Sequence, residues 1–419
     1  MKALILGSGA REHTIAWKMA MSRRIAGLYI APGNAGTAET GENLPKVNPE
    51  SIESVLKVCQ DKQIDLVVVG PEGPLALGVV DELKKKGIQV IGPHREAAQL
   101  ESSKIFSKEF MLRHNIPTAE AVQFSPGKAG AFREHVKGMS GKLVIKKSGL
   151  ASGKGVLESD NGEEIIAFGE RILKSDSLLL EEFLTGFEIS VFALTDGNSY
   201  ALLPPAADFK KAGINDSGPN TGGMGAICPV PVVGSKLLAD VEKNIVAPTF
   251  RGLAEDGLSF AGVLYFGLMI TKEGPKLLEY NVRFGDPEAQ VLIPLIRNDL
   301  GNLFDAMAKG KLDSYPLTLS DNSAVAVVVA SPGYPGDYPK GLEVRELPYS
   351  TRSDALVFHA STHLDDQKKL VTGGGRCFTA VGLHPDILQA RYQAYETARG
   401  IKFDGAWFRK DIGNKFFTD

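Results

Sequence analysis

The chain has 419 residues, of which 43% are hydrophobic and 23% charged, and its net charge is −3. This length allows several domains with sizeable cores, and the composition is ordinary for a globular protein. The absence of a long basic run argues against nucleic acid as a partner, and the longest apolar run, residues 324–330, is too short to cross a bilayer.

The first residues predict a strand rather than a signal peptide, because the apolar residues 3–6 are followed at once by Gly-Ser-Gly and then by Arg11. Three cysteines, Cys59, Cys228 and Cys377, lie far apart and form no Cys-x-x-Cys pattern. This usage favours a reducing, cytoplasmic location and argues against disulfides or a structural zinc.

Residues 1–100 alternate short apolar runs with amphipathic helical patterns, which predicts an N-terminal domain with a doubly wound parallel sheet. The expected strands cover residues 2–6, 28–30, 65–69 and 89–91, and the expected helices cover residues 11–21, 51–61 and 75–85. Ligands bind at the carboxyl ends of such strands. The glycine-containing loops that follow the strands are therefore candidate ligand loops.

The first of these loops, residues 7–10, has two of the three glycines of a dinucleotide-binding turn. That pattern needs a third glycine where Glu12 stands, and an acid at the end of the second strand, where residues 29–31 have none. The sequence therefore disfavours NAD. A single phosphate held by Gly9, Ala10 and Arg11 fits better, and a plain tight turn remains the alternative.

Residues 101–118 predict a connecting helix over residues 103–114 that leads into a domain covering residues 101–186. A strand at residues 143–147 then enters a glycine-rich loop, residues 148–156, whose spacing is not that of a Walker A site. Lys146 and Lys154 stand at its two ends, where they can clamp phosphate oxygens. The alternative is a hairpin without a ligand, although three glycines cost backbone entropy.

An apolar strand over residues 178–184 ends in Glu181 and Glu182. A strand that runs into a linker can present backbone groups to an adenine edge, and a carboxylate just beyond it, such as Glu188, can accept from ribose hydroxyls. Charged strand ends are common, so this segment is weak evidence on its own.

Residues 187–320 predict a further domain with strands at residues 189–194, 201–203 and 262–270 and helices at residues 236–255 and 294–308. Between them lies a glycine-rich stretch, residues 217–225. We expect this stretch to be flexible and to cover a substrate, because its glycines and Asn220 are poor core material.

The polar end of the next strand carries the strongest chemical signal. Glu279, Asn281 and Arg283 follow Leu277 and Leu278 at alternate positions, so a strand presents all three on one face. Carboxylate and amide oxygens suit a hard cation such as Mg²⁺, and an arginine can fork onto a carboxylate or a phosphate. The alternative is an edge strand with a solvated polar face.

Residues 321–419 predict a last α/β unit, with strands at residues 324–330, 356–359 and 377–381 and a helix at residues 385–399. His359 and His363 are four apart but lie on a strand, so they do not form a helical zinc motif. We call the strand that carries Glu279 and Asn281 the metal strand. The sequence has no nucleophile elbow, no Cys/His pair and no paired carboxylates beyond this metal strand. Phosphate clamps, a cation site and an arginine favour phosphoryl transfer.

Taken together, residues 146–156, 218–225 and 279–288 resemble the ATP-grasp ligases, and most closely the phosphoribosylamine–glycine ligase family. Further similar segments are residues 11–13, 31–37, 70–72, 333–337 and 409–413. The resemblance covers essentially the whole chain. It implies a two-lobed ATP-grasp domain, residues 101–186 and 187–320, between the N-terminal domain and a small C-terminal α+β domain, residues 321–419.

The resemblance implies that the chain joins glycine to 5-phosphoribosylamine with ATP, through glycyl phosphate, in purine biosynthesis. The implied cofactors are ATP and Mg²⁺, with Mn²⁺ as a substitute. It further implies a cytoplasmic monomer that acts on small molecules, without nucleic-acid or membrane partners.

By the same resemblance, Glu279 and Asn281 hold the metal, and Arg283 and Asp208 are the catalytic residues, with Arg283 on the glycine carboxylate. The implied ATP contacts are Lys104, Lys146, Gly153, Lys154, Glu181, Glu182, Phe183, Leu184 and Glu188. The implied substrate contacts are Gly9, Arg11, Asn34, Glu72, Lys210, Arg283 and Gly285.

The sequence departs from the family pattern at several positions. The family usually reads Gln-Asp-His-Lys-Arg where residues 207–211 read Ala-Asp-Phe-Lys-Lys, so Ala207 and Phe209 are unusual. It usually has Asp at the position of Ser148, Glu at that of Phe187, and glycines where Ser8 and Ala10 stand.

Three other functions compete with a ligase that uses glycine. An ATP-grasp carboxylase usually carries an extra Glu on the strand before the metal motif, where Tyr265 stands. An NAD-dependent oxidoreductase is disfavoured by the N-terminal loop. A nucleotide sensor without turnover is disfavoured by the full set of phosphate, metal and arginine residues.

Overall fold

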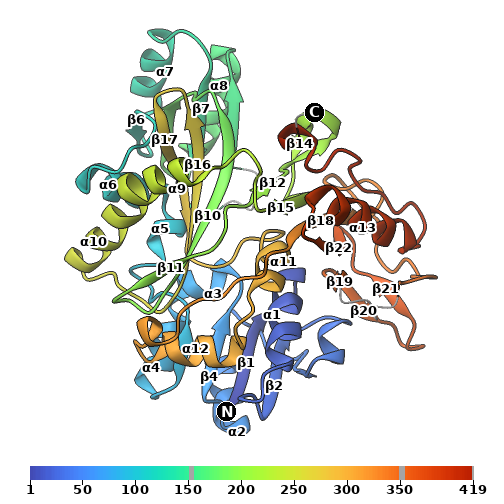
Figure 1. Cartoon of the computed structure of the whole chain (residues 1–419). Helices are drawn as coiled ribbons and strands as arrows, with labels where there is room; N and C mark the ends of the chain where they lie inside the picture. Colours follow the sequence, from blue (N-terminus) through green and yellow to red (C-terminus); the bar gives the residue numbers. More distant parts are fainter. Residues whose placement is uncertain (151–154, 349–353, 418–419) are drawn as a thin grey trace.

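The computed structural model describes residues 1–150, 155–348 and 354–417. Figure 1 shows the N-terminal sheet at the bottom of the view, a lobe containing β7 (Leu143–Lys147), α7 (Ala129–Lys137) and α8 (Gly162–Ile172) at the top, and the C-terminal elements at the right. In this view β17 (Gly274–Asn281) lies beside β16 (Gly262–Thr271).

The N-terminal sheet has the order β3-β2-β1-β4-β5 and every neighbouring pair is parallel. Its strands are β1 (Lys2–Gly7), β2 (Gly27–Pro32), β3 (Glu42–Asn43), β4 (Leu66–Val69) and β5 (Gln89–Ile91), and its first helices are α1 (Ala10–Ala20) and α2 (Ile52–Lys62). The predicted doubly wound parallel sheet is thus confirmed. The helix expected over residues 75–85 is instead two helices, α3 (Glu72–Leu77) and α4 (Val79–Lys85), because Gly78 adopts a left-handed φ of 87° between them.

The connector and the upper lobe follow. The connector consists of α5 (Gln99–Ser102) and α6 (Lys104–Arg113), and Ser103 caps α6 by accepting from the N–H of Phe106. The lobe has an antiparallel sheet, β6-β9-β7-β8, made of β6 (Ala121–Phe124), β9 (Leu178–Glu182), β7 (Leu143–Lys147) and β8 (Val156–Ser159). Its helices, α7 (Ala129–Lys137) and α8 (Gly162–Ile172), were not expected from the sequence; they pack their apolar faces on this sheet through Phe132 and Ile165.

The second lobe is an antiparallel sheet in the order β11-β10-β16-β17. It is made of β11 (Tyr200–Leu202), β10 (Phe187–Thr195), β16 (Gly262–Thr271) and β17. Beside it, α9 (Ser235–Val241), a π-helical turn (Glu242–Val246) and α10 (Ala247–Glu255) form the continuous helix expected over residues 236–255.

The glycine-rich stretch at residues 217–225 is more ordered than expected. Residues Ser217–Asn220 form β14, which pairs with β13 (Lys211–Gly213), and β15 (Gly225–Cys228) joins a larger sheet. The N–H of Thr221 also donates to the carbonyl of Lys210 at 2.7 Å. These backbone pairings satisfy polar groups that an open loop leaves to water, so residues 217–220 form a strand rather than an irregular loop, while the flexibility and the substrate cover expected of this stretch stay predictions.

The C-terminal sheet has the order β12-β15-β18-β22-β19 and is antiparallel. It consists of β12 (Ala207–Asp208), β15, β18 (Ser323–Ala330), β22 (Arg376–His384) and β19 (Ala355–His359), with α13 (Ile387–Gly400) packed on it and the small pair β20 (Thr362–Leu364) and β21 (Leu370–Thr372) nearby. This sheet confirms a C-terminal α+β unit. Two strands of this sheet, β12 and β15, come from residues 207–228. The expected domain boundary at residue 321 therefore cuts through the sheet and leaves these two strands on the other side.

The helix expected over residues 294–308 is shorter than predicted. Helix α12 (Leu300–Ala308) begins only after Asp299, whose side chain accepts from the N–H of Asn302. Before it lie α11 (Ala289–Leu292) and a 3-10 turn (Ile293–Leu295). The cap at Asp299 explains the late start of the helix.

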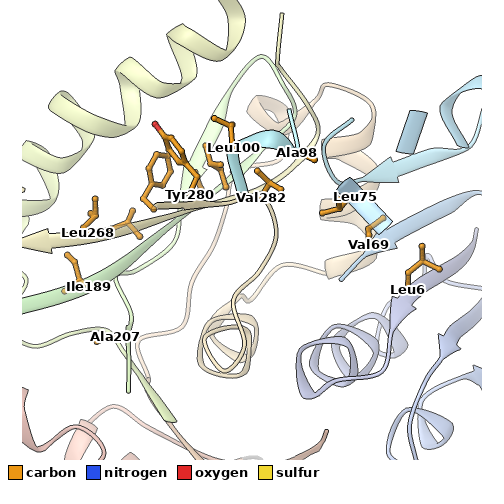
Figure 2. Packing of buried hydrophobic residues seen from close by; sticks show 14 of the residues in the cluster. Leu6, Val69, Leu75, Ala98, Leu100, Ile189, Ala207, Leu268, Tyr280 and Val282 are labelled. Atoms are coloured by element: carbon orange, nitrogen blue, oxygen red, sulfur yellow. The ribbon is translucent and has the colours of Figure 1, made fainter. Parts of the chain in front are cut away.

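One hydrophobic core continues from the N-terminal sheet into the second lobe. Figure 2 shows Leu6 and Val69 of the N-terminal sheet, Leu100 of the connector, and Tyr280 and Val282 of the metal strand in the same cluster. Because Tyr280 and Val282 are buried on this side, the residues that alternate with them turn to the opposite face. Within the described ranges, the structure has no helix that is long and apolar enough to cross a membrane.

Candidate active site

Glu279 and Asn281 lie on one face of β17, as the alternation predicted. The register of β16 and β17 shifts at Gly267, which re-aims the strand just before Glu279. Burial opposes ionisation of Glu279, but Lys104, whose Nζ lies 3.8 Å from its carboxylate, and other nearby cations outweigh that effect and hold its pKa below the usual range. The carboxylate is therefore charged at neutral pH.

The oxygens of Glu279 and Asn281 fit a hard divalent cation. Among the described residues no group of three or more His, Cys, Asp or Glu side chains has the arrangement of a metal site. A cation at this strand would therefore take two ligands from the protein and complete its shell with phosphate and water oxygens, which is the usual pattern for Mg²⁺.

Arg283 extends the same polar face and is held from several sides. Its Nη2 donates to Glu101 at 2.6 Å and to the Oδ1 of Asn281 at 3.2 Å, and its Nη1 donates to the carbonyl of Phe284 at 3.2 Å. Its buried Nε lies 3.6 Å from a carboxylate oxygen of Glu72 and makes no hydrogen bond. Nη1 has two N–H groups and makes one hydrogen bond, so its second N–H is the donor left for a ligand, while Nε is enclosed beside Glu72.

Glu101 is a site residue that the sequence did not reveal. Its carboxylate accepts from Arg283 and, at 2.9 Å, from the main-chain N–H of Val282, so it fixes both the side chain and the strand. Burial raises the pKa of Glu101, although the Arg283 charge opposes this. No local pattern marked Glu101, because it belongs to the connector helix α5.

Lys146 and Glu181 meet at the inner end of the upper lobe. Lys146 Nζ lies 2.6 Å from Glu181 and 3.3 Å from the carbonyl of Leu278, while Lys108 contacts the other oxygen of Glu181 at 2.9 Å. Together with Lys104 and Glu279 these groups line a narrow slot between the lobes. The structure therefore brings three of the predicted phosphate- and metal-binding side chains together with Glu181.

Other predicted ATP contacts lie at the exit of β9. Glu182 accepts from the N–H of Glu120 at 3.0 Å and from Lys276 at 3.2 Å, and Phe183 is partly exposed, with Lys142 Nζ 3.8 Å from its ring centroid. Leu184 is nearly buried. Gly153 and Lys154 lie outside the described residues.

Glu188 and Lys210 form an ion pair of 2.7 Å beside the metal strand. The Lys210 charge lowers the pKa of Glu188, although burial opposes it, and in turn Asp208 and Glu188 keep Lys210 protonated despite burial. Two residues predicted for different ligands, ATP and substrate, are therefore direct partners in this structure.

Asp208, which is half-buried, and Glu288, which is buried, are two acids whose charges interact, and the sequence did not connect them. Burial raises the pKa of both, and the charge of Asp208 helps to raise that of Glu288 to about 8. A charge on Asp208 therefore makes ionisation of Glu288 harder. β12 supplies Asp208 and the turn after β17 supplies Glu288, so no spacing in the sequence reveals this interaction.

The carboxylate of Glu288 occupies the space beside Gly285 that a side chain would otherwise fill. A Cβ atom at Gly285 would lie 2.3 Å from a carboxylate oxygen of Glu288, so a larger residue would displace this acid. The predicted substrate contact Gly285 thus has a clear structural role.

An open cleft of about 410 Å³ separates the N-terminal loops from the C-terminal sheet. We call it the interdomain cleft, and its lining residues are Ser8, Gly9, Gly33, Asn34, Asp286, Tyr334, Tyr338, Ala360, Ser361, Thr362, His363, Gly374, Gly375 and Arg376. Two predicted substrate contacts, Gly9 and Asn34, line it, while Arg11 and Glu72 do not.

The side chain of Asn34 is fully used within the protein. Its Nδ2 donates to the carbonyls of Ser8 at 2.8 Å and His359 at 2.9 Å, and its Oδ1 accepts from the N–H groups of Gly36 and Thr37. Asn34 therefore shapes the cleft wall, because none of its amide groups is left for a ligand.

Arg11 ties the first loop to the metal strand. Its Nε donates to Glu12 at 2.6 Å and its Nη1 donates to the carbonyl of Phe284 at 3.1 Å. The side chain is buried. It therefore couples the N-terminal loop to the turn after Arg283.

Two of the residues that depart from the family pattern, Phe209 and Phe187, pack against the C-terminal segment. Phe209 is buried, with the Arg409 guanidinium 5.3 Å and the Lys415 ammonium 4.9 Å from its ring, and Phe416 packs edge-on against both Phe209 and Phe187. Phe209 thus serves the C-terminal segment as a cation–π and aromatic partner.

Two further unusual positions have local explanations. The hydroxyl of Ser148 accepts from the N–H of Ile105 at 3.5 Å and lies 3.5 Å from the hydroxyl of Ser103. Tyr265, which stands opposite Asn281 where a carboxylase would carry an acid, accepts from the hydroxyl of Ser190 at 3.1 Å.

Comparison with known families covers nearly the whole chain. The N domain of phosphoribosylglycinamide synthetase matches residues 1–101, its ATP-grasp (A) domain matches residues 102–289, and its C domain matches residues 324–415. Because the A domain contains the polar face of β17, the family match includes the residues that form the candidate site.

Individual relatives agree with this match. The chain is 42% identical to a phosphoribosylamine–glycine ligase of Chlorobaculum tepidum, over 99% of the chain and 100% of that protein. It is 44% identical to the trifunctional purine biosynthetic protein adenosine-3 of Gallus gallus over 98% of the chain, but it spans only 42% of the length of that relative.

A solved structure extends the agreement to three dimensions. The crystal structure of a phosphoribosylamine–glycine ligase from Thermotoga maritima superposes with a TM-score of 0.86 at 36% identity, covering 98% of this chain and 100% of the other. Sequence, domain order and fold therefore agree, and the chain belongs to the phosphoribosylglycinamide synthetase family.

Proposed function

We propose that the chain catalyses the ATP-dependent ligation of glycine to 5-phosphoribosylamine, giving glycinamide ribonucleotide, ADP and phosphate. The observation that carries the proposal is the shared polar face of Glu279, Asn281 and Arg283 beside Lys104 and Lys146. The family membership supports the choice of substrates, because relatives of matching length carry that name.

Glu279 and Asn281 hold Mg²⁺ in this proposal, with Mn²⁺ as a substitute. The ion supplies charge neutralisation at the phosphates of ATP. Lys104, Lys146 and the glycine-rich loop that contains Gly153 and Lys154 hold the phosphates, while Glu181 keeps Lys146 in place. The segment Glu182, Phe183 and Leu184 meets the adenine, and Glu188 meets the ribose.

In the first step a carboxylate oxygen of glycine attacks the γ-phosphorus of ATP. The bond from that phosphorus to the bridging oxygen of ADP breaks, which yields glycyl phosphate and ADP. Arg283 binds the glycine carboxylate through the second N–H of Nη1, and Glu101 holds the guanidinium in position. Holding both reactants in line is worth about 7–11 kcal/mol of the barrier.

In the second step the amine nitrogen of phosphoribosylamine attacks the carbonyl carbon of glycyl phosphate. The carbon–oxygen bond to phosphate breaks, and the nitrogen loses a proton. Asp208 accepts this proton, because burial raises the pKa of its carboxyl group and makes the carboxylate a stronger base, with the charge of Lys210 nearby. This assigns a proton-transfer role to the catalytic residue Asp208.

We further propose a monomer that works in the cytoplasm. The cysteines Cys59, Cys228 and Cys377 are all buried and free, as a reducing compartment allows.

A coupled ADP assay tests the function. ADP release should require glycine and phosphoribosylamine together and should fall to background when either is left out. Bicarbonate is the control substrate, because it distinguishes an ATP-grasp carboxylase. Equal ADP release with bicarbonate in place of glycine would reject the proposal.

A further inference from the structure

The two walls of the interdomain cleft differ in charge. On the N-terminal wall the N–H of Gly9 already donates to Glu12 at 2.6 Å. The carboxylate of Asp286 faces the same loop: one of its oxygens lies 3.3 Å from the place that a Cβ atom would take if Gly9 had a side chain. Burial opposes ionisation of Asp286, but Arg376 and Arg11 outweigh it and hold its pKa below the usual range. A phosphate on this wall would meet a carboxylate and find a donor already used.

The C-terminal wall carries the cations. Arg376 and His363 are the basic side chains among the described residues that line the cleft. Beside them, Ser361 offers a hydroxyl and Gly375 a main-chain N–H, and neither donates a hydrogen bond within residues 1–150, 155–348 and 354–417. Hydroxyl, N–H and guanidinium donors are the groups that bind a phosphate dianion.

Arg376 is held ready for such a ligand. Its Nη1 donates to the carbonyl of Gly222 at 2.6 Å and to that of Asp286 at 2.8 Å, and it lies 3.3 Å from the Asp286 carboxylate. Its Nε and Nη2 make no hydrogen bond in the described part of the chain. Neither atom is among the fully buried polar atoms that lack a partner, so both remain accessible. One edge of the guanidinium is therefore fixed by the protein and the other is free.

The residues that line the cleft come from different parts of the chain, and only Asp286 lies close in sequence to the catalytic residue Arg283. Asp286 follows Arg283 closely, and its neighbour Phe284 is tied to Arg11. Arg376 and Ser361 belong to the C-terminal sheet and the turn after β19, and the Nη1 atom of Arg376 reaches across to Asp286. A sugar phosphate that spans the cleft can thus place its two ends near different groups.

We propose that the interdomain cleft binds the phosphate of the sugar-phosphate substrate on its C-terminal wall, through Arg376, Ser361 and the N–H of Gly375, with the amine end of the sugar at Asp286. This inference rests on the proposed function for the identity of the sugar phosphate. It makes the C-terminal unit part of the substrate site, and it moves the phosphate away from Gly9, Ala10 and Arg11.

Calorimetric binding of ribose 5-phosphate and of ribose to the whole protein tests the inference without turnover. Wild-type protein should bind ribose 5-phosphate at least tenfold more tightly than ribose. Arg376→Met should remove most of that difference. Because Arg376 also holds Gly222, Ser361→Asp serves as a second variant that leaves those contacts intact and puts a like charge at the phosphate position.

The matched control is Arg345→Met, which removes an exposed arginine of the C-terminal unit that pairs with Asp404 at the surface. It should bind ribose 5-phosphate as the wild type does. Equal affinity of the wild type for ribose and ribose 5-phosphate, or unchanged affinity in both Arg376→Met and Ser361→Asp, would overturn the inference.

The same variants separate this inference from the proposed function. In the ADP assay, Ser361→Asp should raise the KM for phosphoribosylamine about tenfold or more and leave the KM values for ATP and glycine near those of the wild type. If the wild type binds ribose 5-phosphate through Arg376 but forms no ADP with glycine, the function fails and the phosphate site stands. If ADP forms as proposed but Ser361→Asp leaves every KM unchanged, the phosphate site fails alone.

Discussion

The main-chain N–H of His359 donates a 2.8 Å hydrogen bond to Nδ1 of His13, which lies 346 residues earlier in the chain. The carbonyl of His359 accepts from Asn34 at 2.9 Å. Both polar main-chain groups of one C-terminal residue are therefore held by the N-terminal domain, and this contact fixes the two walls of the interdomain cleft relative to each other. His13 must be neutral to accept at Nδ1.

This contact predicts a loss of stability in acid. Burial, together with the neighbouring His359, lowers the pKa of His13 to about 3, and burial lowers that of His359 to about 4. Both rings then take up their protons on unfolding, so the free energy of unfolding should fall as the pH drops below about 6.5. Each ring contributes about 1.4 kcal/mol per pH unit down to its folded pKa. Denaturant titrations between pH 7.5 and pH 5 measure this slope.

Carboxylates also titrate in acid, so the histidine contribution needs its own comparison. His13→Gln removes one titrating ring and should flatten the slope between pH 6 and pH 5 by about 1.4 kcal/mol per pH unit. His363→Gln changes an exposed histidine and should keep the wild-type slope. An unchanged slope in His13→Gln would show that the buried rings do not control acid stability.

Glu279→Gln should lower Mg²⁺-dependent turnover by about two orders of magnitude or more, because it removes the charged ligand of an ion that contributes several kcal/mol to catalysis. The melting temperature should stay near that of the wild type, since the ion pair with Lys104 is long, at 3.8 Å. Steady-state kinetics against Mg²⁺ concentration and a thermal melt measure both quantities. Glu273→Gln, at the exposed turn of the same hairpin, is the control, and wild-type kinetics in Glu279→Gln would remove the metal assignment.

Glu101→Gln should raise the KM for glycine about tenfold while changing the KM for ATP little, because the Arg283 guanidinium loses its charged partner at 2.6 Å. Arg283→Ala should raise it further. Initial rates with each substrate varied in turn give the two constants. Glu96→Gln, an exposed change just before the connector, should leave both constants unchanged; a matched rise for ATP and glycine in Glu101→Gln would indicate a general structural defect instead.

Phe209→Ala should destabilise the protein by about 3–5 kcal/mol, because it empties a buried site and removes the ring that faces Arg409, Lys415 and Phe416. The folded protein should keep its KM for glycine, since Phe209 packs toward the C-terminal segment. Urea denaturation and steady-state kinetics separate the two effects. A large change in the KM for glycine without loss of stability would place Phe209 at the substrate instead.

Local sequence patterns predicted the parts of the structure that depend on neighbouring residues. The alternation of Glu279 and Asn281 with buried Tyr280 set the polar face of the strand, because side chains alternate along any strand. The N-terminal sheet followed from repeated strand and helix signals. Helix ends were harder to predict: the start of α12 depends on the cap at Asp299, and the break before α4 depends on the conformation of Gly78.

Contacts between distant segments could not be predicted in this way. Glu101 and Arg283 meet across 182 positions, and Arg376 reaches Gly222 across 154. Such pairs form only when whole domains pack together, so no spacing in the sequence reveals them. The same reason explains why Asn34 matched a ligand loop in the sequence, whereas its side chain is consumed by hydrogen bonds between the N-terminal and C-terminal units.

The central claim is that a glycine carboxylate oxygen accepts the terminal phosphoryl group of ATP at the face of Glu279, Asn281 and Arg283. Glycine labelled with ¹⁸O in its carboxylate tests this directly, with mass spectrometry of the inorganic phosphate after turnover with ATP and phosphoribosylamine. The account predicts one labelled oxygen in each phosphate released. Unlabelled phosphate from a reaction that still forms ADP and the amide product would contradict it.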